Sequence, residues 1–312
     1  MLTIRRPGAT SRSAFLLAAI AGAALTSPAT ANVRVCQAQE QNYEQIKSST
    51  TPLELNASLF SAAEKGCTAL AQRLLADGAS LEARDRLGAM PLSRAAKAGQ
   101  VEVVELFLTH GAKIDARDLD GSTALYLAAE ADNRSSVETL IKHGADVNLP
   151  GRSGITPIAA AAYMGSEPLV RLLLEKGADA ESIDGTGKTA ICYAGGRGFP
   201  AVVRVLLEHG VDVNKHYGND LTALMWAAGY TDEAGVNDVA DVMGLLIDRG
   251  ARVDDKDNRG RTALMIAAAL NHTAAAELLI SRGADTSLRD NSGKSAGDLA
   301  SNEALRARLA TR

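Results

Sequence analysis

Glycines recur along this chain at a fixed distance, and this regularity limits the fold more than any other feature. The dipeptide Gly-Ala, or a close variant, begins at Gly78, Gly111, Gly144, Gly177, Gly210, Gly250 and Gly283. Successive glycines are 33 residues apart, except for one step of 40 residues from Gly210 to Gly250. A second marker keeps the same spacing, at Met90, Thr123, Thr156, Thr189, Thr222, Thr262 and Ser295. Such a period predicts an elongated array of stacked units rather than ordinary globular domains.

Each unit has the same internal layout, which residues 118–146 illustrate. A turn rich in Asp and Gly at 118–121 is followed by a short Ala-rich stretch at 123–129. After a polar break, apolar residues recur at helical spacing, at Val137, Leu140 and Ile141. That spacing is typical of an amphipathic helix, and Gly144 stands where a helix ends in a left-handed cap. We therefore predict a turn, a helix, a break, a second helix and a glycine stop.

This layout closely resembles the ankyrin repeat, which has a 33-residue period and a T-P-L-H-x-A signature. The nearest matches to the signature begin at Thr123, Thr156, Thr222 and Thr262. Pairs of alanine such as 128–129 and 161–162 match the small residues that let neighbouring helices of the family approach closely. The resemblance implies an all-α solenoid of about seven to eight helix-turn-helix units joined by hairpin-like loops.

The histidine of the family signature is absent from every unit. Its position is taken by Phe60, Ser93, Tyr126, Ala159, Cys192, Met225 and Met265. Any side-chain hydrogen bond that the histidine supplies between repeats is therefore lost, and we expect apolar packing to compensate.

The N-terminal residues differ from the repeats. Three arginines come first, at Arg5, Arg6 and Arg12. They precede an apolar run at 14–25, too short to span a bilayer, and the small-residue pattern that ends at Ala31. This combination is typical of a secretory signal peptide cleaved after Ala31. We predict a signal peptide at 1–31, an N-terminal segment at 32–52 and a solenoid at 53–312, with capping units near 53–84 and 286–312.

Charge and hydropathy exclude two classes of partner. The chain has 33 Lys and Arg residues against 37 Asp and Glu residues, and no basic face dominates, which argues against nucleic-acid binding. No segment after residue 31 is long and apolar enough to span a bilayer. We therefore expect a monomer without stable membrane insertion after signal cleavage.

The chain has three cysteines, too few for a disulfide scaffold or a four-cysteine zinc site. In an oxidising compartment, Cys36 and Cys67 can close a loop of about 30 residues, which stabilises the fold by about 3–4 kcal/mol in the chain-entropy model. We predict this disulfide, with two free thiols as the alternative. Cys192 occupies a signature position and is expected to be a small buried hydrophobic residue.

No group of residues indicates catalysis, so we predict that the protein is not an enzyme and has no cofactor. The segment at 185–189 lacks the earlier glycine of a phosphate-binding loop, because Ser182 stands at that position. Three histidines occupy equivalent helix ends, too far apart to share a zinc ion readily: His110, His143 and His209.

The step of 40 residues leaves an insertion near 231–238, which we place between the two helices of its repeat. It carries the acidic residues Asp232, Glu233, Asp238 and Asp241. We interpret it as a surface loop, since insertions of this kind cost little free energy. Binding of calcium or a small ligand at 231–241 is the alternative.

The resemblance implies that partners bind a concave face formed by hairpin tips and first helices. Carried over by register, the tip residues are Arg86, Leu87, Leu119, Asp120, Arg152, Ser153, Asn219, Asn258 and Arg259. The first-helix positions are Lys97, Glu130, Tyr163, Met164, Arg197, Tyr230 and Leu270.

Aromatic residues concentrate between residues 163 and 230, on or beside the first helices of consecutive repeats. The predicted patch consists of Tyr163, Met164, Tyr193, Arg197, Trp226 and Tyr230, residue types enriched at interaction hot spots. Packing between repeats is the alternative for Tyr193 and Trp226. We expect the side chains of Tyr163, Met164, Arg197 and Tyr230 to be exposed.

These observations predict an exported, periplasmic solenoid that binds a protein partner on its concave face. Service as an accessory factor for a periplasmic enzyme is a specific form of this hypothesis. A secreted effector that binds a host protein is an alternative from a different class, and fractionation separates the two.

Overall fold

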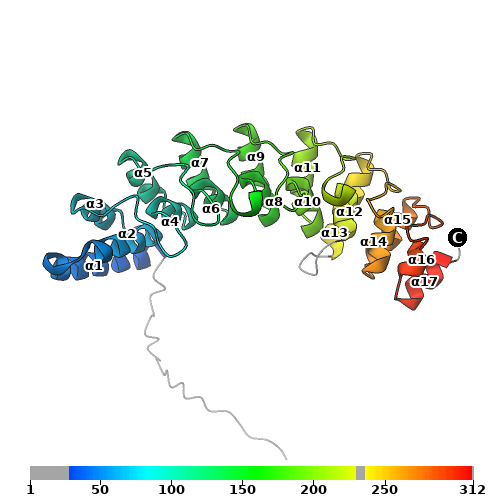
Figure 1. The fold of residues 1–312 in the computed structure, drawn as a ribbon, viewed down its shortest axis with the longest axis horizontal. Helices are drawn as coiled ribbons and strands as arrows, with labels where there is room; N and C mark the ends of the chain where they lie inside the picture. The colour runs from blue at the N-terminus through cyan, green and yellow to red at the C-terminus, as the bar shows by residue number, and fades with distance from the viewer. Residues whose placement is uncertain (1–27, 230–235, 311–312) are drawn as a thin grey trace, which may run out of the picture.

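A computed structural model of the protein describes residues 28–229 and 236–310, and all of their regular structure is helical. None of the helices in these ranges is long and apolar enough to cross a membrane. The helices form an elongated arch of stacked pairs (Figure 1). This arrangement is the predicted all-α solenoid.

Within the part of the chain that the structure describes, eight successive helix pairs make up the arch. They are α2 (Pro52–Lys65) with α3 (Thr68–Ala76), α4 (Pro91–Lys97) with α5 (Val101–Thr109), α6 (Ala124–Glu130) with α7 (Arg134–Lys142), α8 (Pro157–Met164) with α9 (Glu167–Glu175), α10 (Ala190–Arg197) with α11 (Pro200–Glu208), α12 (Ala223–Ala228) with α13 (Val236–Asp248), α14 (Ala263–Ala269) with α15 (Thr273–Ser281), and α16 (Ala296–Leu299) with α17 (Glu303–Ala310). Helices α5, α7, α9 and α11 follow the convex edge in Figure 1, and α4, α6, α8 and α10 follow the inner edge.

Threonines begin several of the first helices by capping them. Oγ1 of Thr123 accepts a hydrogen bond from the backbone N–H of Tyr126, at 3.2 Å, and Thr156, Thr222 and Thr262 cap in the same way. Such a cap satisfies one of the backbone donors that the first turn of a helix leaves unpaired. The repeating threonine of the sequence is therefore a helix start signal.

Small residues let the first helices stack closely. Ala128 and Ala129 are fully buried, as are the matching pairs Ala95–Ala96, Ala161–Ala162, Ala227–Ala228 and Ala267–Ala268. The second helices add larger apolar side chains to the same continuous core, Val137 and Leu140 in α7 for example. Each repeat buries its apolar surface against its neighbours, which is why the array has no separate domain cores.

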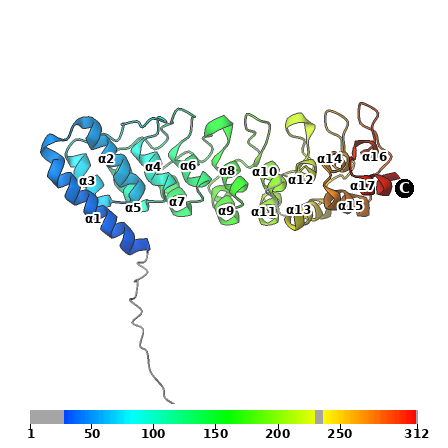
Figure 2. The same ribbon diagram turned by 90° about the horizontal axis from the view of Figure 1, so that it is seen from below.

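Hairpin-like loops connect successive pairs and project from one edge of the arch (Figure 2). In most of them an aspartate holds the turn, as Asp118 does by accepting from the backbone N–H groups of Asp120 and Ser122 at 3.0 and 2.8 Å. Neighbouring loops are also joined directly, because the N–H of Leu119 donates to the carbonyl oxygen of Leu87 at 3.1 Å.

The N-terminal segment is helical, which the sequence did not predict. Helix α1 (Pro28–Ile46) and the short 3₁₀ helix η1 (Lys47–Ser49) lie across the first end of the arch (Figure 2). Of the predicted signal peptide at 1–31, residues 1–27 lie outside the described residues. Its expected cleavage point after Ala31 falls within the first turns of α1.

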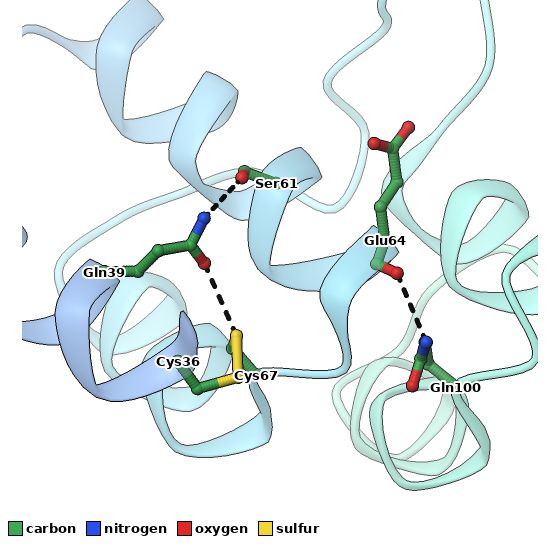
Figure 3. The surroundings of a disulfide bond; sticks show 6 residues. All are labelled: Cys36, Gln39, Ser61, Glu64, Cys67 and Gln100. Carbon is green, nitrogen blue, oxygen red and sulfur yellow. Dashed lines mark hydrogen bonds between the residues drawn. A yellow bond between two sulfur atoms is a disulfide. The ribbon is translucent and has the colours of Figure 1, made fainter. Parts of the chain in front are cut away.

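Helix α1 is joined to the first repeat by a disulfide between Cys36 and Cys67, shown in Figure 3. Beside it, Nε2 of Gln39 donates to Oγ of Ser61 at 2.7 Å. The amide oxygen of Gln39 lies 3.4 Å from the sulfur of Cys67, which is a contact only, since a bonded sulfur has no proton to donate. Tyr43 is the buried anchor of α1, and its hydroxyl donates to Asp77 at 2.8 Å.

The insertion was predicted to form a surface loop, and its C-terminal end is helical instead. Residues 230–235 lie outside the described residues, but 236–238 belong to α13. That helix has 13 residues, whereas α5, α7, α9, α11 and α15 each have 9. Part of the insertion therefore lengthens a helix instead of forming a loop.

Candidate functional site

The predicted tip residues occupy the exposed turns of the hairpins. Leu119 and Asp120 form one tip, and the other predicted tip residues are also exposed: Arg86, Leu87, Arg152, Ser153, Asn219, Asn258 and Arg259. The η2 turn (Arg152–Gly154) and the η3 turn (Gly218–Asp220) replace the aspartate-held turn in two of these hairpins. Every tip residue of the prediction is therefore accessible to a partner.

Exposed apolar side chains are confined to one side of the solenoid beyond α3. Among the described residues from 77 onward, the exposed large apolar side chains lie in hairpins or at the ends of first helices: Leu87, Leu119, Tyr163, Met164, Ile183 and Leu270. The second helices contribute none among the residues whose exposure the structure describes. Scattered surface apolar residues need no explanation, so the places where such side chains adjoin one another are the ones to consider as a site.

A groove of about 420 Å³ opens on this side, across α6, α8 and α10. We call it the tyrosine groove, and its lining residues are Tyr126, Glu130, Arg152, Ile155, Ala160, Tyr163, Met164 and Tyr193. The side chains of Tyr163 and Met164 are 42% and 45% exposed, in agreement with the predicted exposure. The groove therefore presents apolar surface to solvent at the middle of the arch.

Glu130 organises one wall of the tyrosine groove. Its Oε1 accepts from the hydroxyl of Tyr126 at 3.1 Å and from Nη2 of Arg152 at 2.8 Å. Nζ of Lys97 lies 3.6 Å from its other oxygen. Burial, followed by the charge of Glu130, raises the pKa of Tyr126 to about 12. The phenol thus stays protonated at neutral pH and remains a donor to Glu130.

Aromatic rings and cations alternate beside the groove, where Tyr163 and Tyr193 line it and Arg197, Lys188 and Trp226 lie behind these rings, outside the lining. The rings of Tyr163 and Tyr193 meet edge to face, with centroids 5.8 Å apart. The guanidinium carbon of Arg197 lies 4.2 Å from the Tyr163 centroid, and Nζ of Lys188 lies 5.3 Å from the Tyr193 centroid and 5.1 Å from that of Trp226. Cations over ring faces are attracted by the ring quadrupole, and this holds these side chains together.

In the predicted patch, one residue departs from the expectation, one follows the alternative left open for it, and one is not described. Arg197 is half-buried, not exposed, because its guanidinium stacks on Tyr163. Trp226 is half-buried and packs against the core, which is the alternative considered for it. Tyr230 lies outside the described residues.

The buried carboxylate of Asp184 holds the side chain of Tyr193 in place. Its hydroxyl donates to Asp184, whose other oxygen accepts from the backbone N–H groups of Thr186 and Lys188 at 2.7 and 3.1 Å. Burial opposes the charge on Asp184, but hydrogen bonds from Tyr193, Lys188 and Thr186 outweigh it and lower the pKa of Asp184. Asp184 therefore stays ionised and holds the ring that lines the groove.

Sequence reasoning missed Tyr126, Lys188 and Asp184 as parts of this site. Tyr126 was predicted only as a substitute for the signature histidine, and Lys188 only as part of a failed phosphate-binding motif. A signal for Tyr126 was present, because Gly151 interrupts the series of hairpin aspartates at Asp85, Asp118, Asp184, Asp257 and Asp290. A glycine there leaves space for a large side chain from the preceding helix.

The described residues contain no cluster of three or more His, Cys, Asp or Glu side chains arranged to hold a metal ion. Of the acidic insertion, Asp238 and Asp241 lie on α13, while Asp232 and Glu233 are outside the described residues. His110 and His209 end their helices, with Nδ1 2.8 and 2.9 Å from the carbonyl oxygens of Leu106 and Val205.

Cys192 is buried and unbonded, as predicted, and burial raises the pKa of its thiol to about 11.

A comparison with protein-family models identifies a family for this chain. A model described as ankyrin repeats (3 copies) matches residues 59–151, 148–217 and 214–290, which together span more than half of the chain. No curated protein matches the chain in sequence.

Proposed function

The chain belongs to the ankyrin repeat family, and on that premise we propose that it is an exported scaffold that binds another protein on the concave side of its arch. Ankyrin repeats are protein–protein interaction modules, and proteins built from them are typically non-enzymatic. The proposal for this chain adds the location of the binding face and the compartment.

One observation carries the proposal for the face. Beyond α3, the described exposed apolar side chains are all on hairpins and first-helix ends, and two of them, Tyr163 and Met164, are adjacent at the rim of the tyrosine groove. Tyr, Met and Arg are enriched at interfaces, where Tyr buries a large ring, Met adapts its flexible side chain to the partner and Arg binds through a planar guanidinium group. Arg152 and Arg197 stand beside them.

Two features support export to an oxidising compartment. Residues 1–31 have the charge and apolar pattern of a signal peptide, and the Cys36–Cys67 disulfide is of the kind that persists outside the cytosol. We place the protein in the periplasm, where it acts as an accessory factor for a partner enzyme. Secretion beyond the envelope to bind a host protein is the competing proposal.

The face is tested with residues 32–312 as bait in a periplasmic extract, with captured proteins identified by mass spectrometry. Tyr163→Ala/Met164→Ala is expected to lose the partner. The matched control is Glu138→Ala/Lys142→Ala on α7, at the convex edge, which is expected to keep it. Circular dichroism verifies that both variants fold.

Two outcomes contradict the proposal. Equal capture by both variants places the binding site away from this face. Accumulation of the full-length protein in the culture medium, with none in the periplasm, favours the host-directed alternative.

A further inference from the structure

Resting on this proposed function, we propose that the tyrosine groove recognises a linear segment of the partner in which an apolar side chain is flanked by carboxylates. The groove supplies the apolar contact, and cations at its rim supply the charge preference. This inference assigns a chemistry to the partner, which the family relationship leaves open.

The apolar part of the groove's lining is suited to an apolar side chain. Ile155, Ala160 and Met164 line it together with the tyrosine rings. Its volume of about 420 Å³ lies within the range of about 300–1,000 Å³ that ligand pockets occupy. A large aliphatic or aromatic residue of the partner therefore finds room between rings from three successive repeats.

Cations at the rim remain available to a partner. The side chain of Arg152 is 59% exposed, and its Nη2 donates to Glu130. A guanidinium carries five N–H donors in a fork that matches a carboxylate, so Arg152 retains donors for a second acid. Lys188 does not line the groove itself, but its Nζ lies over the ring of Tyr193, which does, and within the described chain no carboxylate oxygen comes within 4 Å of that Nζ.

The acidic groups of the groove are already engaged, which disfavours a basic partner. Glu130 accepts from Tyr126 and Arg152 and has Lys97 3.6 Å away, so its charge faces two cations. Asp184 is buried beneath the ring of Tyr193 and accepts its hydroxyl. Neither carboxylate is free to pair with a lysine or arginine of the partner, whereas Arg152 and Lys188 can pair with an acid.

One exposed acid opposes this preference and provides a gain-of-binding variant. Asp120 occupies the tip of the hairpin that precedes the one carrying Arg152. The charge of Glu130 raises the pKa of Arg152 most, and the charge of Asp120 adds to this effect. Removing this competing carboxylate is expected to tighten binding of an acidic segment, because Arg152 then has one acid fewer nearby.

The test is a selection of random linear peptides, displayed on phage, against residues 32–312. We expect the enriched peptides to contain an apolar residue with Asp or Glu on either side. Binding of the synthesised peptides, measured by fluorescence polarisation, is expected to weaken about tenfold or more with Arg152→Gln, since a hydrogen bond between charged groups contributes about 1.5–3 kcal/mol. It is expected to weaken with added salt, and to tighten with Asp120→Asn.

Arg204→Gln is the matched control, because Arg204 is an exposed arginine on α11, a helix of the convex edge and outside the predicted binding face. It is expected to leave the affinity unchanged. Enrichment of basic or purely apolar peptides, no enrichment at all, or equal affinity for Arg152→Gln would each overturn the inference. If the bait experiment still loses its partner with Tyr163→Ala/Met164→Ala, the proposed function stands while this inference fails.

Discussion

The ring of Tyr126 occupies the space that a side chain on Gly151 would need. A Cβ atom built on Gly151 would lie 2.3 Å from Cγ of Tyr126, far inside van der Waals contact. Two repeats further along, the sizes are exchanged, because the small Cys192 holds the helix position and the buried Tyr217 holds the hairpin position. The pKa of Tyr217 is raised by burial, then by Glu181 and by Cys192, which marks that cysteine as its neighbour. The space left by the missing signature histidine is thus filled by a helix residue, Tyr126, in one repeat and by a hairpin residue, Tyr217, in the other.

Replacing Gly151 with alanine is expected to destabilise the protein by about 1–3 kcal/mol, the usual cost of overpacking a core. The added methyl group collides with the ring of Tyr126, which is buried and cannot move into solvent. Chemical denaturation followed by circular dichroism measures the free energy of unfolding. The destabilisation caused by Gly151→Ala should be smaller in a Tyr126→Ala background, where the ring no longer occupies the space of the added methyl group.

Gly244 provides the control for the same substitution. It lies within α13, and a Cβ atom there would be 3.8 Å from Nη2 of Arg282, an ordinary contact. Gly244→Ala is expected to be neutral or stabilising, because alanine favours helices more than glycine does. Equal effects at both glycines would contradict the packing argument.

Stability is expected to fall as the pH rises from about 10, the ordinary tyrosine pKa, to about 12, the raised pKa of Tyr126. A raised folded-state pKa means that the stabilisation is complete below the unfolded-state pKa and is lost as the pH passes the folded-state value. Tyr126→Phe keeps the ring but has no proton to lose, so its stability should decline less steeply. Urea unfolding of both proteins across this pH range measures their free energies of unfolding. If these decline equally with pH in wild type and Tyr126→Phe, the prediction is wrong.

Asp184 is expected to stabilise the protein at neutral pH and to lose this effect in acid. Its folded-state pKa is lowered, so the stabilisation is present above the ordinary aspartate pKa of about 3.9 and decreases as the pH falls through the lower folded value. At neutral pH, Asp184→Ala should cost about 1–3 kcal/mol, because it leaves the buried donors of its turn unpaired. The difference in free energy of unfolding between wild type and Asp184→Ala should become smaller in acid. A difference that stays constant from neutral to strongly acidic pH would contradict this role of Asp184.

The disulfide is expected to contribute about 3–4 kcal/mol, as the chain-entropy model gives for a loop of this length. Cys36→Ser/Cys67→Ser should lower the free energy of unfolding by that amount and should speed proteolysis within α1. Wild-type protein treated with a thiol reductant is the control and should match the double variant. Thiol labelling of the unreduced, denatured protein should modify Cys192 alone, and labelling of all three cysteines would disprove the bond.

The sequence by itself determined the repeated part of this protein. The recurring threonines cap helices, the recurring glycines end them and the alanine pairs bring them together, and each of these effects acts within one repeat or between adjacent ones. Local signals repeated at a fixed period can be recognised without knowledge of distant contacts. For the same reason the exposed hairpin tips, such as Arg86 and Asn258, could be placed by register alone.

Only the tertiary structure decided how side chains from different repeats share space. The groove forms because Tyr126, Tyr163 and Tyr193, from three repeats, line one surface, and because Asp184 holds the last ring from a hairpin. The position of α1 likewise depends on Tyr43 reaching Asp77, across 34 residues of sequence. Burial, ring stacking and the size exchange at Gly151 and Tyr217 depend on distances in space, which the order of residues along the chain does not specify.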